Sequence, residues 1–179
     1  MESMKWKPNI VEPPPCRVFI AAYFDDLQRY VDVKKEIEKG FGEVDFTSES
    51  LDSDSLPSVY KGVSRRHVRF LSLKRPSGRE EIVDLKKTAI GIETKFQSEG
   101  RPSVELDIGY VTDSSVVRSS LEDGYGRIYI YGGIYAETLY YFENYTFHAL
   151  QGLPLFYFKK EVVTVFNDLR LILTSQQKL

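Results

Sequence analysis

The sequence holds a single cysteine, Cys16, so no disulfide can form within the chain. The N-terminus also lacks the apolar stretch of a signal peptide, and together these two absences predict a cytoplasmic protein. No apolar run approaches the roughly 18 residues that a membrane helix needs, so we expect no membrane partner. The 24 basic residues nearly cancel the 26 acidic ones, which argues against a dominant basic field for wrapping nucleic acid.

The motifs that bind common cofactors are missing too. The sequence contains no G-x-x-x-x-G-K-[ST] loop, and no G-x-G-x-x-G follows the first predicted strand, so it lacks the standard phosphate-binding loops. The two histidines, His67 and His148, lie far apart, and no cysteine cluster accompanies them. A zinc site needs more ligands than these, so we expect neither a cofactor nor a metal ion.

The chain does contain enough apolar sequence for one globular domain. Its 179 residues and 42% hydrophobic content are typical of a single soluble domain. Residues 1–15 are predicted to form an N-terminal arm, because Pro13-Pro14-Pro15 is stiff and lacks backbone donors. We assign residues 16–179 to one α+β domain.

The first two thirds of that domain alternate between strand and helix patterns. Short apolar runs or strict alternation predict strands near 18–24, 44–46, 67–73 and 104–108. Apolar residues at helical spacing predict helices near 27–41 and 82–96. The resulting order, βαββαβ, is that of a ferredoxin-like core.

The last third predicts an extension of that core. A strand near 116–120 is followed by alternating isoleucines and tyrosines around Gly132-Gly133, a pattern typical of an antiparallel hairpin or meander with a turn or bulge. Residues 162–173 have the spacing of a C-terminal helix. We therefore predict an antiparallel sheet whose helices pack on one face.

The most unusual stretch is residues 125–158, which contain half of the aromatic side chains of the chain. Between 125 and 150 the charged residues are Arg127, Glu137 and Glu143 alone. Strand alternation places Arg127 and Glu137 on the tyrosine side of the hairpin. Two interpretations follow: a buried ion pair capped by tyrosine hydroxyls, or the polar floor of an aromatic-walled pocket.

We favour a binding role over catalysis. Arg127 would hold the anionic group of a small ligand, within a site formed by Arg127, Tyr129, Tyr131, Tyr135, Glu137 and Tyr110. Homodimerisation through the same sheet face or edge, or docking of another protein, uses these residues equally well. The expected partners are thus a small anionic ligand or a second copy of the chain.

Two alternatives stay open. An enzyme, a hydrolase or lyase acting on a small anionic or nucleotide-like substrate, would use Asp107 or Glu137 as its acid or base and Arg127 as a charge clamp. The segment 61–79 holds seven basic residues and no acid, and could bind GTP or nucleic acid. Five acidic residues in 43–54 can neutralise that segment, so nucleic acid is not an expected partner.

Several short strings, taken in order, resemble a known family. They are Phe41-Gly42-Glu43-Val44-Asp45, Leu85-Lys86-Lys87-Thr88, Asp107-Ile108-Gly109-Tyr110, Arg127-Ile128-Tyr129 and Gly133-Ile134-Tyr135-Ala136-Glu137. From about residue 16 to 175 the chain resembles a bacterial family catalogued as domain of unknown function 4416. The resemblance implies a bacterial, cytoplasmic, single-domain protein and supplies no activity or catalytic residue. Some members are labelled GTP-binding, but no nucleotide motif here supports that label.

The chain departs from the family pattern at several positions, among them Leu153-Pro154-Leu155-Phe156-Tyr157 in place of a usual Tyr-Pro-Asp-Tyr string. Gly126 stands where a polar residue, often His, usually precedes the Arg-Ile-Tyr string; Ile108 replaces a usual Pro; and Glu105 replaces a usual Asn. These losses weaken the enzyme interpretation and affect a binding role less.

Overall fold

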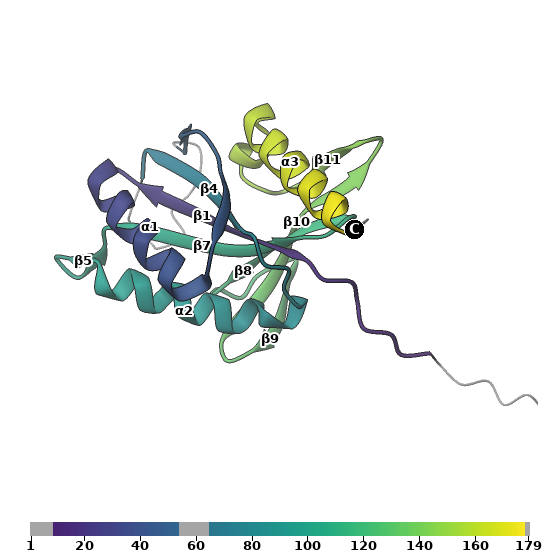
Figure 1. Cartoon of the computed structure of the whole chain (residues 1–179), viewed down its shortest axis with the longest axis horizontal. Helices are drawn as coiled ribbons and strands as arrows, with labels where there is room; N and C mark the ends of the chain where they lie inside the picture. The colour runs from purple at the N-terminus through teal and green to yellow at the C-terminus, as the bar shows by residue number, and fades with distance from the viewer. Residues whose placement is uncertain (1–8, 54–64, 178–179) are drawn as a thin grey trace, which may run out of the picture.

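The computed structural model describes residues 9–53 and 65–177, and within them the chain has an α+β fold with helices on both sides of one large sheet (Figure 1). The α-helices are α1 (Leu27–Phe41), α2 (Ile82–Lys95) and α3 (Lys160–Gln176). Single 3-10 turns, η1 (Arg79–Glu81) and η2 (Leu155–Phe158), precede α2 and α3. None of the described helices is both long and apolar enough to cross a membrane.

Nine strands form the main sheet, and all of their pairings are antiparallel. They are β1 (Arg17–Phe24), β2 (Val44–Thr47), β3 (Leu51–Asp52), β4 (His67–Leu73), β7 (Val104–Val111), β8 (Ser115–Ser120), β9 (Arg127–Tyr131), β10 (Ile134–Glu143) and β11 (Thr146–Ala149). The order across the sheet is β11-β10-β8-β7-β1-β4-β2, with β3 on β4 and β9 on β10. A separate small sheet pairs β5 (Gln97–Ser98) with β6 (Arg101–Pro102).

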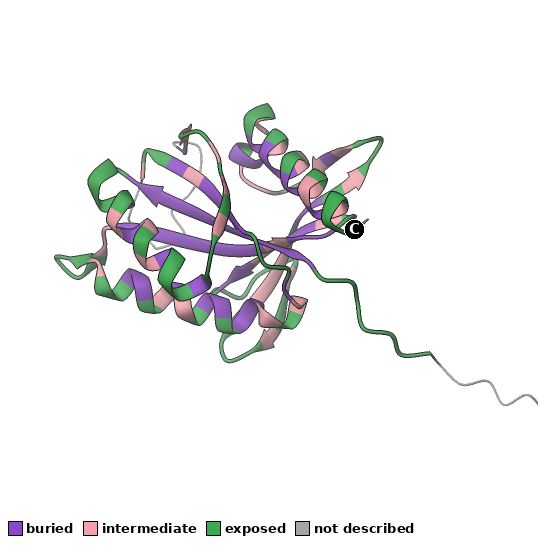
Figure 2. Cartoon of the chain, in the orientation of Figure 1, coloured by how far each residue is buried: buried purple, intermediate pink, exposed green. Residues whose placement is uncertain are grey.

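The central strand β1 is buried along its whole length, as its purple ribbon in Figure 2 shows. Its side chains alternate between the two faces of the sheet. Val18, Ile20 and Ala22 enter a core with α1 and α2, whereas Phe19, Ala21 and Tyr23 enter a core with α3. Helices on both faces thus explain why the sequence of β1 is a continuous apolar run rather than an alternating one.

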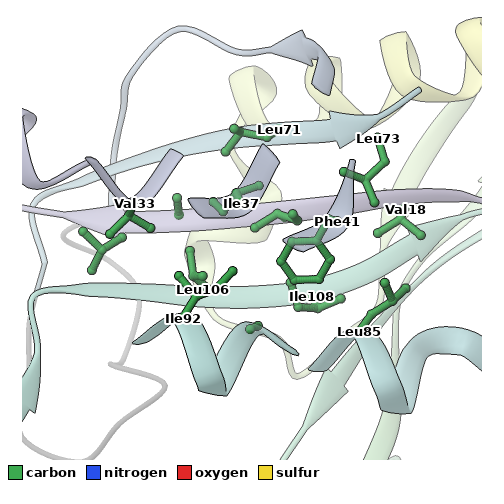
Figure 3. Close-up of a cluster of buried hydrophobic side chains, with 14 of the residues drawn as sticks. Val18, Val33, Ile37, Phe41, Leu71, Leu73, Leu85, Ile92, Leu106 and Ile108 are labelled. Carbon is green, nitrogen blue, oxygen red and sulfur yellow. The ribbon is translucent and has the colours of Figure 1, made fainter. Parts of the chain in front are cut away.

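Each of the two cores joins the sheet to its own helix layer. On one face, Val33, Ile37 and Phe41 of α1 meet Leu106 and Ile108 of β7, with residues of α2 beside them (Figure 3). On the other face the rings of Phe19, Phe70 and Phe166 pack edge to face or tilted, with centroids 5.0 to 6.4 Å apart. Such aromatic contacts add stabilisation beyond the area they bury.

The α+β class predicted from the sequence is confirmed, but two finer expectations need correction. The helices do not share one face, because Val162, Phe166 and Leu169 of α3 pack on the side opposite α1 and α2. The sheet is also larger than a four-strand ferredoxin-like sheet and has a different overall order. Strands β8, β10 and β11 continue the sheet past β7, and the apolar face that they add is covered by α3.

Part of β7 has no strand partner on the side of β8, and two charged side chains of α2 hydrogen-bond to its backbone there. Strand β8 pairs with β7 at Gly109, Tyr110 and Val111, so the backbone of Leu106 has no strand partner on that side. Lys86 Nζ donates to the carbonyl oxygen of Leu106 at 3.0 Å, and the Leu106 amide donates to Glu93 Oε1 at 2.5 Å. These bonds satisfy buried backbone groups that would otherwise be costly to leave unpaired.

The hairpin between β9 and β10 combines a tight turn with a bulge. Gly132 and Gly133 both have positive φ, 63° and 79°, as a two-residue hairpin turn requires. Tyr131 lies opposite Ile134, yet Tyr129 lies opposite Tyr135, so Ile130 is an extra residue on β9. This bulge changes which face the side chains beyond it occupy.

Candidate functional site

Four charged side chains from neighbouring strands lie on the α3 side of the sheet. Glu137 of β10 stands opposite both Arg118 of β8 and Arg127 of β9. Arg118 in turn stands opposite Gly109 of β7, two residues from Asp107, so all four side chains share one face. We call this set, Asp107, Arg118, Glu137 and Arg127, the charged network.

The members of the charged network are joined by short contacts. Arg118 donates through Nε to Glu137 Oε2 at 2.6 Å and through Nη1 to Asp107 Oδ2 at 3.1 Å. Arg127 Nε lies 3.6 Å from the same Glu137 oxygen. Its Nη1 donates to the backbone oxygen of Glu122 at 3.0 Å and lies 3.6 Å from the Glu122 carboxylate. Both guanidinium groups therefore already have anionic partners.

Burial within the charged network increases from the hairpin towards the centre of the sheet. The Arg127 side chain is 19% exposed, Arg118 and Glu137 are each 13% exposed, and Asp107 is 3% exposed. Asp107 Oδ1 is buried and makes no hydrogen bond to any residue in the described ranges. The network is thus a polar path that begins at the protein surface and ends inside the fold.

Two buried tyrosines lie at the inner end of this path. They are Tyr23 and Tyr157, and the Tyr140 hydroxyl donates to the Tyr157 backbone oxygen at 2.7 Å. Burial raises the pKa of Tyr157 to about 12, although the nearby Arg118 opposes the shift. Burial also raises the pKa of Tyr23 well above its ordinary value. Both hydroxyls therefore stay protonated at neutral pH.

Neighbouring groups keep the Arg118 guanidinium protonated. Burial is the largest single influence and lowers the pKa of Arg118, but Asp107, Tyr157 and Glu137 together outweigh it, so the net pKa lies above the ordinary value. Removing either charge would leave the other buried without a partner, which is strongly unfavourable. The core of the charged network is therefore a buried ion pair between Arg118 and Asp107.

The six site residues predicted from the sequence are divided between the two faces of the sheet. Tyr129 and Tyr135 lie on the side of Arg127 and Glu137, and their rings meet edge to face at 5.3 Å. Tyr131 lies on the opposite side, where Lys87 of α2 approaches its ring to 5.5 Å. Tyr110 is also on that side, packed against a small cluster that includes Val83 and Ile134. The bulge at Ile130 separates Tyr131 from the other hairpin tyrosines.

A family model described as Domain of unknown function (DUF4416) matches residues 14–172. The chain belongs to this family. The comparisons with curated proteins and with solved structures give no match. Membership confirms the resemblance seen in the sequence and assigns no function to the DUF4416 chain.

Arg118 is the one member of the charged network that the sequence reasoning did not select. Asp107, Arg127 and Glu137 were all chosen as candidates, and Arg118 is the cation that connects them. The signal for it was present, because Arg118 lies between Val117 and Ser119 in a predicted strand. The rule of alternation that was applied to Asp107 also predicts one fixed face for Arg118.

Half of the basic residues that the structure describes in segment 61–79 form ion pairs. Arg65 pairs with Asp25 at 3.1 Å, Lys74 with Glu43 at 3.0 Å, and Arg75 with Glu81 at 2.7 Å. Lys61 lies outside the described residues. Across the described ranges, no three His, Cys, Asp or Glu side chains come close enough to hold a metal ion.

Proposed function

We propose that this DUF4416 chain is a protein-interaction domain that self-associates by pairing β9 with β9 of a second copy. The observation that carries the proposal is the exposure of β9. This strand pairs with β10 along one edge, and no described strand covers its other edge. Ile128 is 72% exposed and Tyr129 is 58% exposed, so the edge presents apolar side chains together with unpaired backbone groups.

The sequence of β9 supports this proposal because it lacks the usual protection of an edge strand. Proteins commonly guard free edges with lysine, proline or outward-facing charge. Strand β9, Arg127–Tyr131, has no lysine and no proline. Its one charge, Arg127, folds back onto Glu122 and Glu137 instead of facing the open edge.

A second copy is the occupant that fits this edge best. In an antiparallel pair centred on Tyr129, Ile128 of one copy would oppose Ile130 of the other, and the two Tyr129 rings would meet. Leu121 and Tyr125 are exposed in the loop just before β9 and extend the apolar surface. A stable interface needs about 800 Å² from each partner, so the loop would have to take part in it together with the five-residue strand.

A small anion bound at Arg127 is less well supported. Arg127 and Arg118 are already held by Glu122, Glu137 and Asp107, so an anionic ligand would first have to displace a carboxylate. The three carboxylates outnumber the two guanidinium groups in this cluster. Its charge therefore does not favour an anion.

We also propose that the ferredoxin-like arrangement persists within the larger sheet. The four strands β7-β1-β4-β2 are adjacent and antiparallel, with α1 and α2 on one face, and this supports the assignment. On this view β8 to β11 and α3 are additions, and β9 belongs to the added part.

The test of self-association is the mass of the purified chain in solution. Analytical ultracentrifugation should show a species of twice the 20.7 kDa chain mass that dissociates on dilution. Ile128→Lys and Tyr129→Lys place a charge on the edge and should each give a monomer. Leu171→Lys is the matched control, because Leu171 is 59% exposed on α3, away from β9. A wild-type chain that is monomeric at every concentration would rule the proposal out.

A further inference from the structure

A pocket of about 640 Å³ lies beside β11, where Figure 1 shows α3 next to that strand. Its described lining comes from β10, β11, the loop after β11, η2 and α3. None of these lining residues is Asp, Glu, Lys or Arg, and none belongs to the charged network. Small-molecule sites in proteins have volumes of roughly 300–1,000 Å³. The pocket is therefore large enough for a small molecule, and its described lining favours an uncharged one.

The outer edge of β11 directs backbone hydrogen-bonding groups away from the sheet. The Leu150 amide donates to the carbonyl oxygen of Leu139 at 3.0 Å, which fixes the alternation of the β10–β11 ladder. By that alternation Phe147 and Ala149 turn their N–H and C=O groups away from β10. The Phe147 amide indeed donates to Asn167 Oδ1 on α3 at 3.0 Å. The N–H and C=O of Ala149 have no such partner among the described residues, and Ala149 lines the pocket.

Aromatic side chains flank this edge on both faces of the sheet. On the face opposite α3, the rings of Tyr141 and His148 stack with their centroids 5.4 Å apart. His148 Nε2 donates to the carbonyl oxygen of Glu143 at 3.1 Å, which holds the imidazole ring in place. From the α3 side, Phe158 of η2 and Val163 of α3 line the pocket, and Phe158 is 48% exposed. A flat ring that continues the plane of the sheet from β11 would therefore lie between aromatic faces.

We propose that this pocket binds a flat, uncharged ring amide, which bonds to the backbone of Ala149 and lies between the rings of His148 and Phe158. A ring amide carries a carbonyl oxygen beside an N–H group, so its edge accepts from the Ala149 N–H and donates to the Ala149 carbonyl oxygen. Nucleobases and other ring amides share this chemistry. The ligand carries no phosphate, because the described lining offers no Lys or Arg to hold one.

This site does not depend on the proposed self-association. Ala149 lies opposite Tyr140, whereas Ile128 of β9 lies opposite Ala136, so about 13 Å of β10 separates the two surfaces. One interpretation of the sequence places an aromatic-walled pocket at the β9–β10 hairpin. The pocket described here lies at the opposite, C-terminal end of β10.

Isothermal titration with two matched probes tests this mode of binding. Quinazolinone is a flat ring amide, and its derivative methylated on the amide nitrogen has the same rings but no N–H to donate to Ala149. The unmethylated probe should bind at least about tenfold more tightly, because methylation removes a hydrogen bond and leaves a carbonyl oxygen without a partner. Uridine presents the same edge on a nucleoside. Tighter binding of uridine than of quinazolinone would identify the ligand as a nucleoside, and the reverse order would identify it as a fused ring amide.

Two variants test the site from the protein side. Ala149→Pro removes the outward N–H, a change that an edge strand tolerates, and should lower the affinity for quinazolinone about tenfold. Phe158→Ala removes one aromatic wall and should also lower it about tenfold. Tyr145→Ala is the matched control and should change nothing, because Tyr145 is 97% exposed at the tip of the β10–β11 hairpin and does not line the pocket. Urea denaturation verifies that each variant is folded.

The outcomes separate this site from self-association. Equal affinity for the two quinazolinones, no binding of any probe, or unchanged affinity in either variant that folds would overturn the proposal. Tyr129→Lys, which should disrupt the β9 pairing, should leave quinazolinone binding intact. Loss of binding in that variant would show that the site requires a second copy, and the proposal as stated would be wrong. A chain that is monomeric at every concentration and still discriminates between the two probes would keep this site and rule out self-association.

Discussion

The centre of the sheet and the β9–β10 hairpin differ in the burial and polarity of their side chains. Around β1, β4 and β7 both faces are covered by helices, and most of the side chains are apolar and buried. Around β9 and β10, charged and tyrosine side chains alternate with aliphatic ones, and Tyr129 and Tyr131 are exposed. In Figure 2 the ribbon of this hairpin is mostly pink and green. This difference supports the proposal that the hairpin region contacts another molecule, whereas the central strands hold the fold together.

The largest expected difference concerns a core ring. Phe19→Ala removes a side chain that contacts both Phe70 and Phe166 in the α3 core. We expect the free energy of unfolding to fall by about 4 kcal/mol, because the cavity cannot be refilled by rigid strands. Urea denaturation followed by far-ultraviolet circular dichroism measures this loss. A change below about 1 kcal/mol would mean that the centre of the sheet is not the stable region.

Arg118 tests whether the charged network is structural at its inner end. Arg118→Met leaves Asp107 buried without its cation and should lower the free energy of unfolding by about 3 kcal/mol. The double variant Arg118→Met with Asp107→Asn should recover part of that loss, since the uncompensated charge is gone. Denaturation of the two single variants and the double variant gives the coupling energy. Strict additivity would show that the contact of 3.1 Å between these residues carries no energy.

These expectations rest on a fold that the sequence predicted in part. Strand β1, helices α1 and α2 and the strand at Val104 follow from periodicity, because each buries a regular apolar stripe. The position of α3 does not follow, since its apolar stripe fits either face of the sheet until the contacts with Phe19 and Phe70 select one. The pairing register of β9 with β10 could not be predicted either. The turn at Gly132-Gly133 sets one register, and the bulge at Ile130 then shifts it by one residue.

The sequence also predicted the candidate site only in part. Alternation brought Arg127 and Glu137 to one face correctly, and the structure joins both to Asp107 through Arg118. Tyr131 and Tyr110 could not be assigned to a face in this way. One lies past a bulge, and the other is on a strand whose neighbours only the folded sheet reveals.

Alkaline titration tests Tyr157, a buried tyrosine at the inner end of the charged network. The pKa of Tyr157 is raised to about 12 in the folded chain, so its contribution to stability is complete below about pH 10 and is lost as the pH rises through 12. We expect stability to fall in that window, and Tyr157→Phe to reduce the fall. Tyrosinate absorbance against pH, with denaturation at matched pH values, checks both statements. A flat stability profile up to pH 12 would contradict them.

The smallest effect is expected at the hairpin itself. Tyr129→Ala removes an exposed ring and should change the free energy of unfolding of the isolated chain by no more than about 0.5 kcal/mol. The measurement is made in the Ile128→Lys background, so that self-association does not contribute. A loss as large as that of Phe19→Ala would erase the distinction between the two regions.

Hydrogen exchange at β9 tests the central claim most directly. If two copies pair through this strand, the amide protons of β9 that point away from β10 should be protected at high protein concentration and should exchange faster on dilution, while β1 stays protected throughout. Rapid exchange of β9 at every concentration, with an unchanged β1, would show that the edge is free and that the chain does not self-associate there.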